Sequence, residues 1–359
     1  MRKKGLLAIL IALVLCMGNI ACGNTDAANN KNTDKKYSVV CTIFPEYDWV
    51  KEVLGDKADN FEMNLLLDNG VDLHSYQPTA ADIAKIAQCD LFIYVGGESD
   101  EWVEDALAEA TNKDMQVINL LEVLGDSVKE EEVVEGMEDE HEHEHGEDEH
   151  EEDEHDHEHD EEEHEHDEDE HEHHHEEGEI EYDEHVWLSL KNSQVLVDAI
   201  AASVAVIDPD NASVYTGNAK AYNEKLGALD EEYAKAVDAA DVKTVLFGDR
   251  FPFRYMVDDY GLDYYAAFVG CSAETEASFE TVTFLAGKVD ELKLGSILVI
   301  ESSDKKIAET IKQNTADKNQ NILVLDSMQS TTSGDIEAGK TYLGIMTDNL
   351  EVLKEALKQ

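Results

Sequence analysis

The sequence predicts an α/β protein of two lobes, each built on a parallel sheet, with one long helix joining them. Short apolar runs rich in Val, Ile, Leu and Tyr alternate with amphipathic stretches, first over residues 37–120 and again over residues 244–357. This alternation is typical of βαβ units, whose strands are parallel. Between the two series, Pro209 opens a helical stretch that runs to about Ala239. That helix would be on the order of 45 Å long, enough to connect two lobes.

The first series places strands and helices close together along the chain. Thr79 is a candidate N-cap, because Asp82 follows three residues later and nearly completes a capping box. Gly55 is a candidate helix end. The expected strands are residues 37–45, 61–67, 89–96 and 115–120, and the expected helices are residues 47–55, 79–88 and 102–110. Ligand-binding residues are expected at the carboxyl ends of such strands.

The second series repeats the alternation after a helical stretch at residues 192–208. Its expected strands are residues 244–249, 262–269, 296–301 and 321–326, and its expected helices are residues 278–292, 304–314 and 341–357. We therefore divide the chain into an N-terminal lobe at 37–207, a linking helix at 208–240 and a C-terminal lobe at 241–359. The N-terminal lobe carries a loop rich in His and Glu at about residues 130–180.

The start of the chain has the pattern of a bacterial lipoprotein signal. Three basic residues at positions 2–4 precede an apolar run over residues 6–17, which is too short for a comfortable membrane span. The following Ile-Ala-Cys resembles a lipobox, so we expect residues 1–21 to be a signal peptide and Cys22 to be lipidated. Residues 22–36 would be a flexible tether. The alternative is an ordinary secretory signal in which Cys22 occurs by chance.

A tract of histidine and acidic residues dominates the composition. Thirteen of the 15 histidines lie in residues 141–175, and residues 130–184 hold 34 of the 83 acidic residues and none of the basic ones. Histidine alternating with carboxylates is a compositional sign of metal handling, and the tract is too polar to pack a core. Most of the net charge of −56 comes from this tract, because the rest of the chain has 49 acidic residues against 27 basic ones. That acidic balance still argues against nucleic acid as a partner and suits attraction of cations.

Two histidines remain for a folded metal site. His74 lies just beyond the second predicted strand and His185 just beyond the tract. The last predicted strand ends at Asp326. The three cysteines within the predicted lobes are an odd number, which argues against a disulfide framework. Cys41 and Cys89 have strand-like apolar surroundings, so buried thiols are favoured there over a soft metal site; the third cysteine is Cys271.

Two patterns that suggest nucleotide binding or catalysis are rejected. Residues 334–341 read GDIEAGKT and match the phosphate-loop pattern, but seven residues separate them from the strand, and two acidic side chains would face the phosphates. Two HExxH matches fall inside the tract, where no apolar face could fix a metalloprotease helix. We therefore expect a protein that is not an enzyme.

Four segments in order resemble the metal-binding solute receptors of ATP-driven zinc and manganese importers. They read GVDLHSYQPTAADI, CDLFIYVGG, EHVWLSLKN and YLGIMTDNLEVLKEAL. The resemblance covers essentially all residues from about Tyr37 to Leu357, and zinc-type members carry a His-rich acidic loop before the second ligand. It implies two α/β lobes joined by a long helix with the metal between them. By this resemblance His74 and His185 are the first two ligands, and Asp326 matches a carboxylate ligand of some members.

One position departs from the family pattern. The third family ligand, His or Glu, falls in the segment LFGDRFPFRY, where Gly248 has no side chain to offer. Asp249 next to it, and Glu274 or Glu276 in CSAETEAS, are the candidates to replace it. Two imidazoles with one or two carboxylates suit zinc better than manganese, whereas a ligand at Asp249 or Glu276 would shift the site toward manganese.

The resemblance also implies a function and partners. The chain would bind zinc, or alternatively manganese, and deliver it to a membrane permease driven by a separate ATPase subunit. It would be a monomer, held at the outer face of the bacterial cell membrane by the lipid on Cys22. The alternatives are a manganese-specific receptor of the same family and a surface lipoprotein that buffers metal or mediates adhesion.

Overall fold

The computed structural model describes residues 36–137, 181–272 and 276–358. From Tyr37 onward the chain forms one compact unit. The predicted signal peptide, the lipidation candidate Cys22, the histidines of residues 141–175 and the candidate ligand Glu274 all lie outside the described residues.

The N-terminal sheet has four parallel strands in the order β2-β1-β3-β4. Val39, Val40 and Cys41 on β1 are fully buried, as expected for a central parallel strand that is covered on both faces. Thr79 caps α3 as predicted, because its side chain accepts the N–H of Asp82. The elements of this lobe are β1 (Tyr37–Cys41), α2 (Phe44–Leu54), β2 (Phe61–Leu65), α3 (Ala80–Ile86), β3 (Leu91–Tyr94), α4 (Trp102–Ala108), β4 (Gln116–Asn119) and α5 (Leu120–Leu124).

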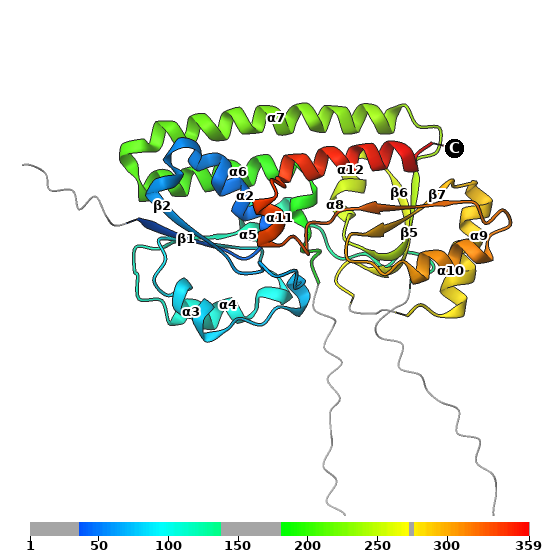
Figure 1. Cartoon of the computed structure of the whole chain (residues 1–359), viewed down its shortest axis with the longest axis horizontal. Coiled ribbons are helices and arrows are strands. Elements are labelled where there is room, and N and C mark those ends of the chain that lie inside the picture. The colour runs from blue at the N-terminus through cyan, green and yellow to red at the C-terminus, as the bar shows by residue number, and fades with distance from the viewer. Residues whose placement is uncertain (1–35, 138–180, 273–275, 359) are drawn as a thin grey trace, which may run out of the picture. The chain divides into compact units, whose positions relative to one another are not determined.

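The C-terminal sheet repeats this design with the order β6-β5-β7-β8, again with all strands parallel (Figure 1). The predicted fold class is therefore confirmed. The strand predicted to end at residue 249 continues to Phe251, so β5 includes Asp249 and Arg250. The elements are β5 (Thr244–Phe251), α8 (Arg254–Tyr260), β6 (Asp263–Val269), α9 (Phe279–Leu292), β7 (Ser296–Ile300), α10 (Lys306–Asn314), β8 (Asn321–Leu325) and α11 (Ser333–Glu337).

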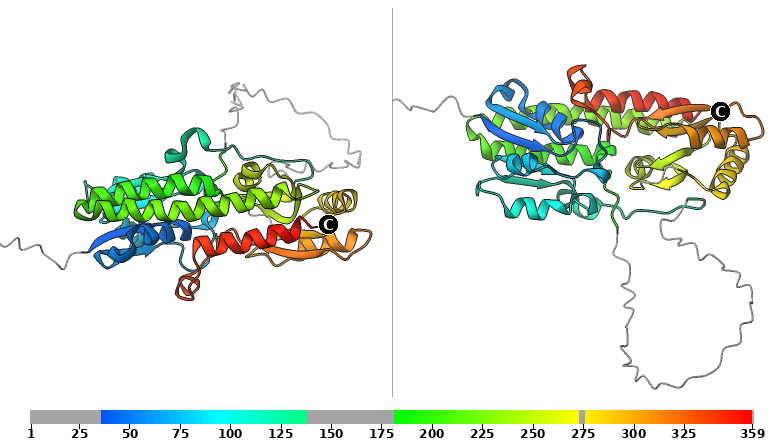
Figure 2. Two further views of the ribbon diagram at one scale, coloured as in Figure 1. Left: turned by 90° about the horizontal axis from the view of Figure 1, so that it is seen from above. Right: turned by 60° about the horizontal axis from the view of Figure 1, so that its bottom comes forward.

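Long helices link the two sheets. Helix α6 (Leu190–Ile207) packs along α7 (Ala212–Asp238), and Figure 2 shows the two side by side. The C-terminal helix α12 (Tyr342–Ala356) packs on α2 and α7 as well as on β7 and β8. At its first residue, the Tyr342 N–H donates to Asp48 of α2 at 2.8 Å. A second helix therefore spans the two lobes, where the sequence predicted only one.

Helix α6 is long and apolar enough to cross a membrane, judged by length and composition within the described residues. Its apolar face is instead used inside the protein. Leu196, Val197, Ile200 and Val204 are buried against the core. We therefore interpret α6 as a core helix.

Three short helices, α5, α8 and α11, were not expected from the sequence. They have five to seven residues, so each offers at most about two turns and only a weak 3.6-residue periodicity. Helix α11 includes Gly334 to Glu337 of the phosphate-loop-like pattern, and the Lys340 ammonium pairs with Asp335 at 3.0 Å. A segment whose first residues lie within a helix and whose lysine is already paired does not form a phosphate cradle.

Candidate metal centre

The centre lies at the carboxyl ends of the strands, where parallel α/β lobes bind ligands. His74 sits in a single 3-10 turn, Leu73–Ser75, that follows β2. Asp72 caps this turn by accepting the His74 N–H at 3.1 Å. The His74 Nδ1 atom lies 2.8 Å from the Ser99 hydroxyl and 3.4 Å from a Glu184 carboxylate oxygen. These contacts on one side of the ring turn its Nε2 atom toward the centre.

His185 is held in the same way by another carboxylate. Its side chain is fully buried, and it directly precedes the 3-10 turn Val186–Leu188 that leads into α6. One oxygen of Asp183 accepts the His185 backbone N–H at 2.8 Å and lies 3.0 Å from Nδ1. A carboxylate on Nδ1 fixes the tautomer in which Nε2 carries the free lone pair.

The two imidazoles meet at these free nitrogens. The Nε2 atoms of His74 and His185 are 3.1 Å apart, and the amide nitrogen of Gln329 lies 3.2 Å and 2.9 Å from them, respectively. Two imidazole ligands of one tetrahedral zinc ion would have nitrogens about 3.3 Å apart, given bonds of about 2.0–2.1 Å. The spacing of His74 and His185 therefore fits two ligands of a single ion.

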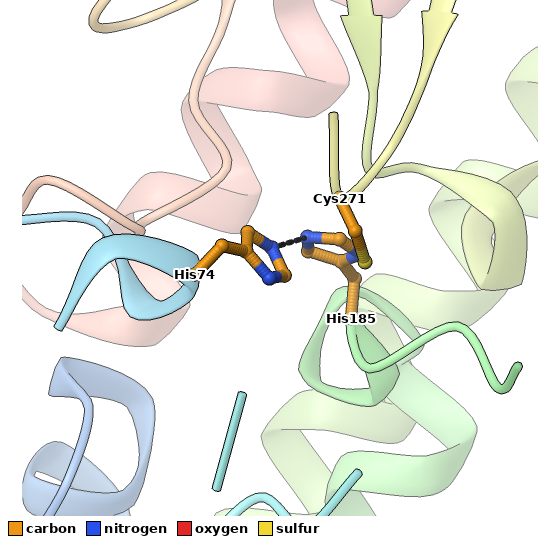
Figure 3. A group of neighbouring side chains, drawn as sticks. All are labelled: His74, His185 and Cys271. Atoms are coloured by element: carbon orange, nitrogen blue, oxygen red, sulfur yellow. Dashed lines mark hydrogen bonds between the residues drawn. The ribbon is translucent and has the colours of Figure 1, made fainter. Parts of the chain in front are cut away.

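A cysteine completes the group. Cys271 follows β6. Its sulfur, one ring nitrogen of His74 and one of His185 all lie within 4.8 Å of one another, and Figure 3 shows the three side chains together. Burial, together with the carboxylates of Glu131, Asp183 and Glu184, raises the pKa of the Cys271 thiol well above its usual value. Of the residues that the structure describes, this is the group of His, Cys, Asp and Glu side chains arranged to share one ion.

The carboxylates predicted as ligands do not join this group. Asp326 accepts the Met328 N–H at 2.8 Å, and burial and the nearby Glu301 raise its pKa to about 6. Asp249 accepts the Arg250 N–H at 2.9 Å, and its other carboxylate oxygen is buried without a hydrogen bond. Glu276 is exposed, and its negative charge contributes to raising the pKa of Lys306. These three residues lie outside the group, and their metal-ligand roles stay predictions.

The absence of a side chain at Gly248 has a packing reason. A Cβ atom there would lie 2.6 Å from the backbone of Ala308 on α10. The neighbouring residue that reaches the centre from β5 is Arg250, whose guanidinium pairs with Asp72 and lies 3.4 Å from the Gln329 side-chain oxygen. Burial acts to raise the pKa of Asp72, but Arg250 and His74 outweigh it and lower that pKa. Strand β5 therefore brings a cation to the centre, not a ligand.

An acidic cavity of about 270 Å³ opens beside His74. Its wall includes Cys271 and four glutamates, which are Glu98, Glu131, Glu181 and Glu184. In the chain, Glu131 precedes the histidines of residues 141–175 and Glu181 follows them. A cation that enters from solvent would therefore pass negative charge before it reaches the imidazoles.

Comparisons with known proteins agree with this chemistry. The sequence model of the family ZnuA, described as zinc-uptake complex component A, periplasmic, matches residues 39–356. The high-affinity zinc uptake system protein ZnuA of Bacillus subtilis (strain 168) is 30% identical over 338 residues, which cover 94% of this chain and 93% of that protein. The zinc-binding lipoprotein AdcA of Streptococcus pneumoniae (TIGR4) is 32% identical over 353 residues. That match covers 98% of this chain but only 61% of AdcA, so the chain spans about three fifths of that relative.

Solved structures of two related proteins are similar to this chain over about nine tenths of its length. The crystal structure of the Zn(II)-bound ZnuA-like domain of Streptococcus pneumoniae AdcA is 27% identical, with a TM-score of 0.64, and the match covers 90% of this chain and 100% of that one. The metal-dependent lipoprotein YcdH of Bacillus subtilis is 25% identical, with a TM-score of 0.65, over 89% of this chain and 99% of that one.

Proposed function

This chain belongs to the ZnuA family of zinc-uptake complex components, and we propose that it is the zinc receptor of an ATP-driven importer. It would bind zinc outside the cytoplasm and pass it to a membrane permease that a separate ATPase subunit drives. The family consists of solute receptors, so no residue is assigned a catalytic role.

One observation carries the proposal. The Nε2 atoms of His74 and His185 face each other at 3.1 Å, and a carboxylate lies on the far side of each ring. In many zinc sites a carboxylate binds one ring nitrogen of a histidine and the metal binds the other. The carboxylate orients the ring and raises its basicity. Nitrogen donors favour zinc over manganese and calcium, which prefer sites made of oxygen.

The location and the organisation of the chain are also part of the proposal. We propose that Cys22 is lipidated and that residues 22–36 tether a monomeric receptor to the outer face of the membrane. The name of AdcA, a zinc-binding lipoprotein, supports this anchoring. The division into lobes at 37–207 and 241–359 is also proposed, with α12 as a second connection between them. The histidine tract would collect zinc next to the acidic cavity.

A competition titration of the full chain against a tight zinc chelator tests the function. Such a chelator removes zinc from the weak sites of the tract, so the titration reports only the tight site. His74→Ala and His185→Ala should each weaken that site by more than about a hundredfold, since even partners of ligands contribute tenfold to a hundredfold. His150→Ala, a change of the same kind within the tract, is the matched control and should leave the affinity unchanged. Unchanged affinity in both of the first two variants would exclude the proposed site.

A further inference from the structure

Resting on the proposed zinc-receptor function, we infer that the Cys271 thiolate is the third ligand and sets the preference for zinc over manganese. The first observation is the position of its sulfur, within 4.8 Å of one ring nitrogen of His74 and one of His185. Figure 3 shows the three side chains converging from separate segments of the chain. The thiol thus reaches the imidazoles from the C-terminal lobe.

The chain next to Cys271 is built for a close approach. At Gly270, an added Cβ would lie 3.0 Å from the His185 ring and 2.9 Å from the Phe251 carbonyl oxygen. Only glycine lets the backbone come this near to the ring. The Cys271 backbone is fixed in turn, because its N–H donates to a Glu131 carboxylate oxygen at 3.3 Å. Gly270 and Glu131 together place the thiol beside the imidazole.

The C-terminal carboxylates predicted as ligands lie outside the group of His74, His185 and Cys271. Gly248 has no room for a side chain, and the cationic Arg250 beside it pairs with Asp72. Asp249 and Asp326 each accept a nearby backbone N–H and lie outside the group. Cys271 therefore replaces the imidazole or carboxylate that the sequence resemblance placed on β5.

The chemistry of a thiolate determines which metal is bound. When zinc binds, the S–H bond breaks, an S–Zn bond forms, and the proton leaves through the acidic cavity to solvent with no change in oxidation state. Thiolate with two imidazoles is a donor set that suits zinc, whereas manganese and calcium favour oxygen donors. Cys271 is thus expected to discriminate between metals as well as to add affinity.

Cobalt(II) alone, added to the full chain kept under reducing conditions, is the probe. A cysteine ligand gives a thiolate-to-cobalt charge-transfer band in the near ultraviolet, and imidazole ligands give only weaker visible bands. The tract contains no cysteine, so cobalt bound there does not contribute to the ultraviolet band. We expect the band in the wild type and in Cys89→Ala, which changes a buried cysteine of the N-terminal lobe, and its loss in Cys271→Ser.

The same variants separate the two levels of the proposal. Cobalt binding that needs His74 and His185 but gives no ultraviolet band would overturn the role of Cys271 and leave the receptor function intact. If cobalt binding did not depend on His74 and His185 either, both the role of Cys271 and the receptor function would be overturned. Thermal unfolding of metal-free Cys271→Ser should match the wild type, which shows that the fold is kept.

Metal selectivity provides the second measurement. Cys271→Asp replaces sulfur with oxygen at the same position. The ratio of the manganese Kd to the zinc Kd should fall at least about tenfold in this variant. A ratio equal to that of the wild type would contradict the role of Cys271 in selectivity.

Discussion

The N-terminal lobe orients two imidazoles with carboxylates of its own, whereas the C-terminal lobe ties up its strand-end carboxylates and offers a thiol. In the first lobe, Asp183 lies 3.0 Å from the Nδ1 atom of His185. In the second, the carboxylates of Asp249 and Asp326 accept N–H groups from residues one or two positions along the chain. Asp183 also accepts a nearby N–H, that of His185, so a local backbone hydrogen bond does not separate the two lobes. The difference is that Asp183 reaches an imidazole as well.

The largest expected effect is on the pH dependence of stability, and it concerns one buried acid in each lobe, Glu46 and Asp326. Burial, and then the charge of Asp100, raises the pKa of Glu46 to about 8, whereas the pKa of Asp326 rises to about 6. A carboxyl with a raised folded pKa binds more protons in the folded state, so the free energy of unfolding falls as pH rises between the unfolded and folded values. For Glu46 this window runs from about 4.5 to about 8.

Glu46→Gln should therefore flatten the pH dependence of stability between pH 5 and pH 9. The wild type should lose on the order of a few kcal/mol relative to the variant across this range, at about 1.4 kcal/mol per pKa unit. Urea unfolding of both proteins at pH 5 and at pH 9 measures this difference in the free energy of unfolding. Asp326→Asn is the comparison from the other lobe and should remove a smaller change that is complete by about pH 7. Equal pH dependence in wild type and Glu46→Gln would show that Glu46 titrates normally.

The second prediction tests the carboxylates near the ligands. Asp183→Asn keeps the size of the side chain but removes the charge that orients His185, so zinc affinity should fall about tenfold. Asp249→Asn makes the same chemical change at a carboxylate outside the group and should alter the affinity by less than about twofold. Chelator competition measures both. A larger loss in Asp249→Asn than in Asp183→Asn would restore Asp249 as a ligand.

The third prediction addresses the ion pair that joins the lobes beside the centre. Asp72→Asn leaves the Arg250 cation unpaired and should weaken zinc binding, whereas Arg250→Gln frees the Asp72 carboxylate and should strengthen it. Each change should be a few-fold, up to about tenfold, because the charges are partly exposed and screened. Titrations at low and high salt measure both effects, which salt should reduce. Changes of the same sign in the two variants would mean that the pair acts through the fold and not through its charges.

The sequence by itself determined the architecture and pointed to two candidate ligands. Its periodicity predicted both parallel sheets, and its resemblance to zinc and manganese receptors is confirmed by the family match over residues 39–356. It also singled out His74 and His185, because no other histidine lies outside the tract. These features depend on local pattern and composition, which can be read without knowing which segments meet in space.

Tertiary structure alone decided what the C-terminal lobe contributes. Which of Asp249, Asp326, Glu276 and Cys271 lies near the imidazoles depends on contacts between segments more than 60 residues apart, such as Cys271 with His185. A signal was present in Gly270-Cys271, since glycine before a cysteine permits close approach of the backbone. Its meaning needed the position of the His185 ring, because a glycine is explained only by the atoms that would clash with its missing side chain.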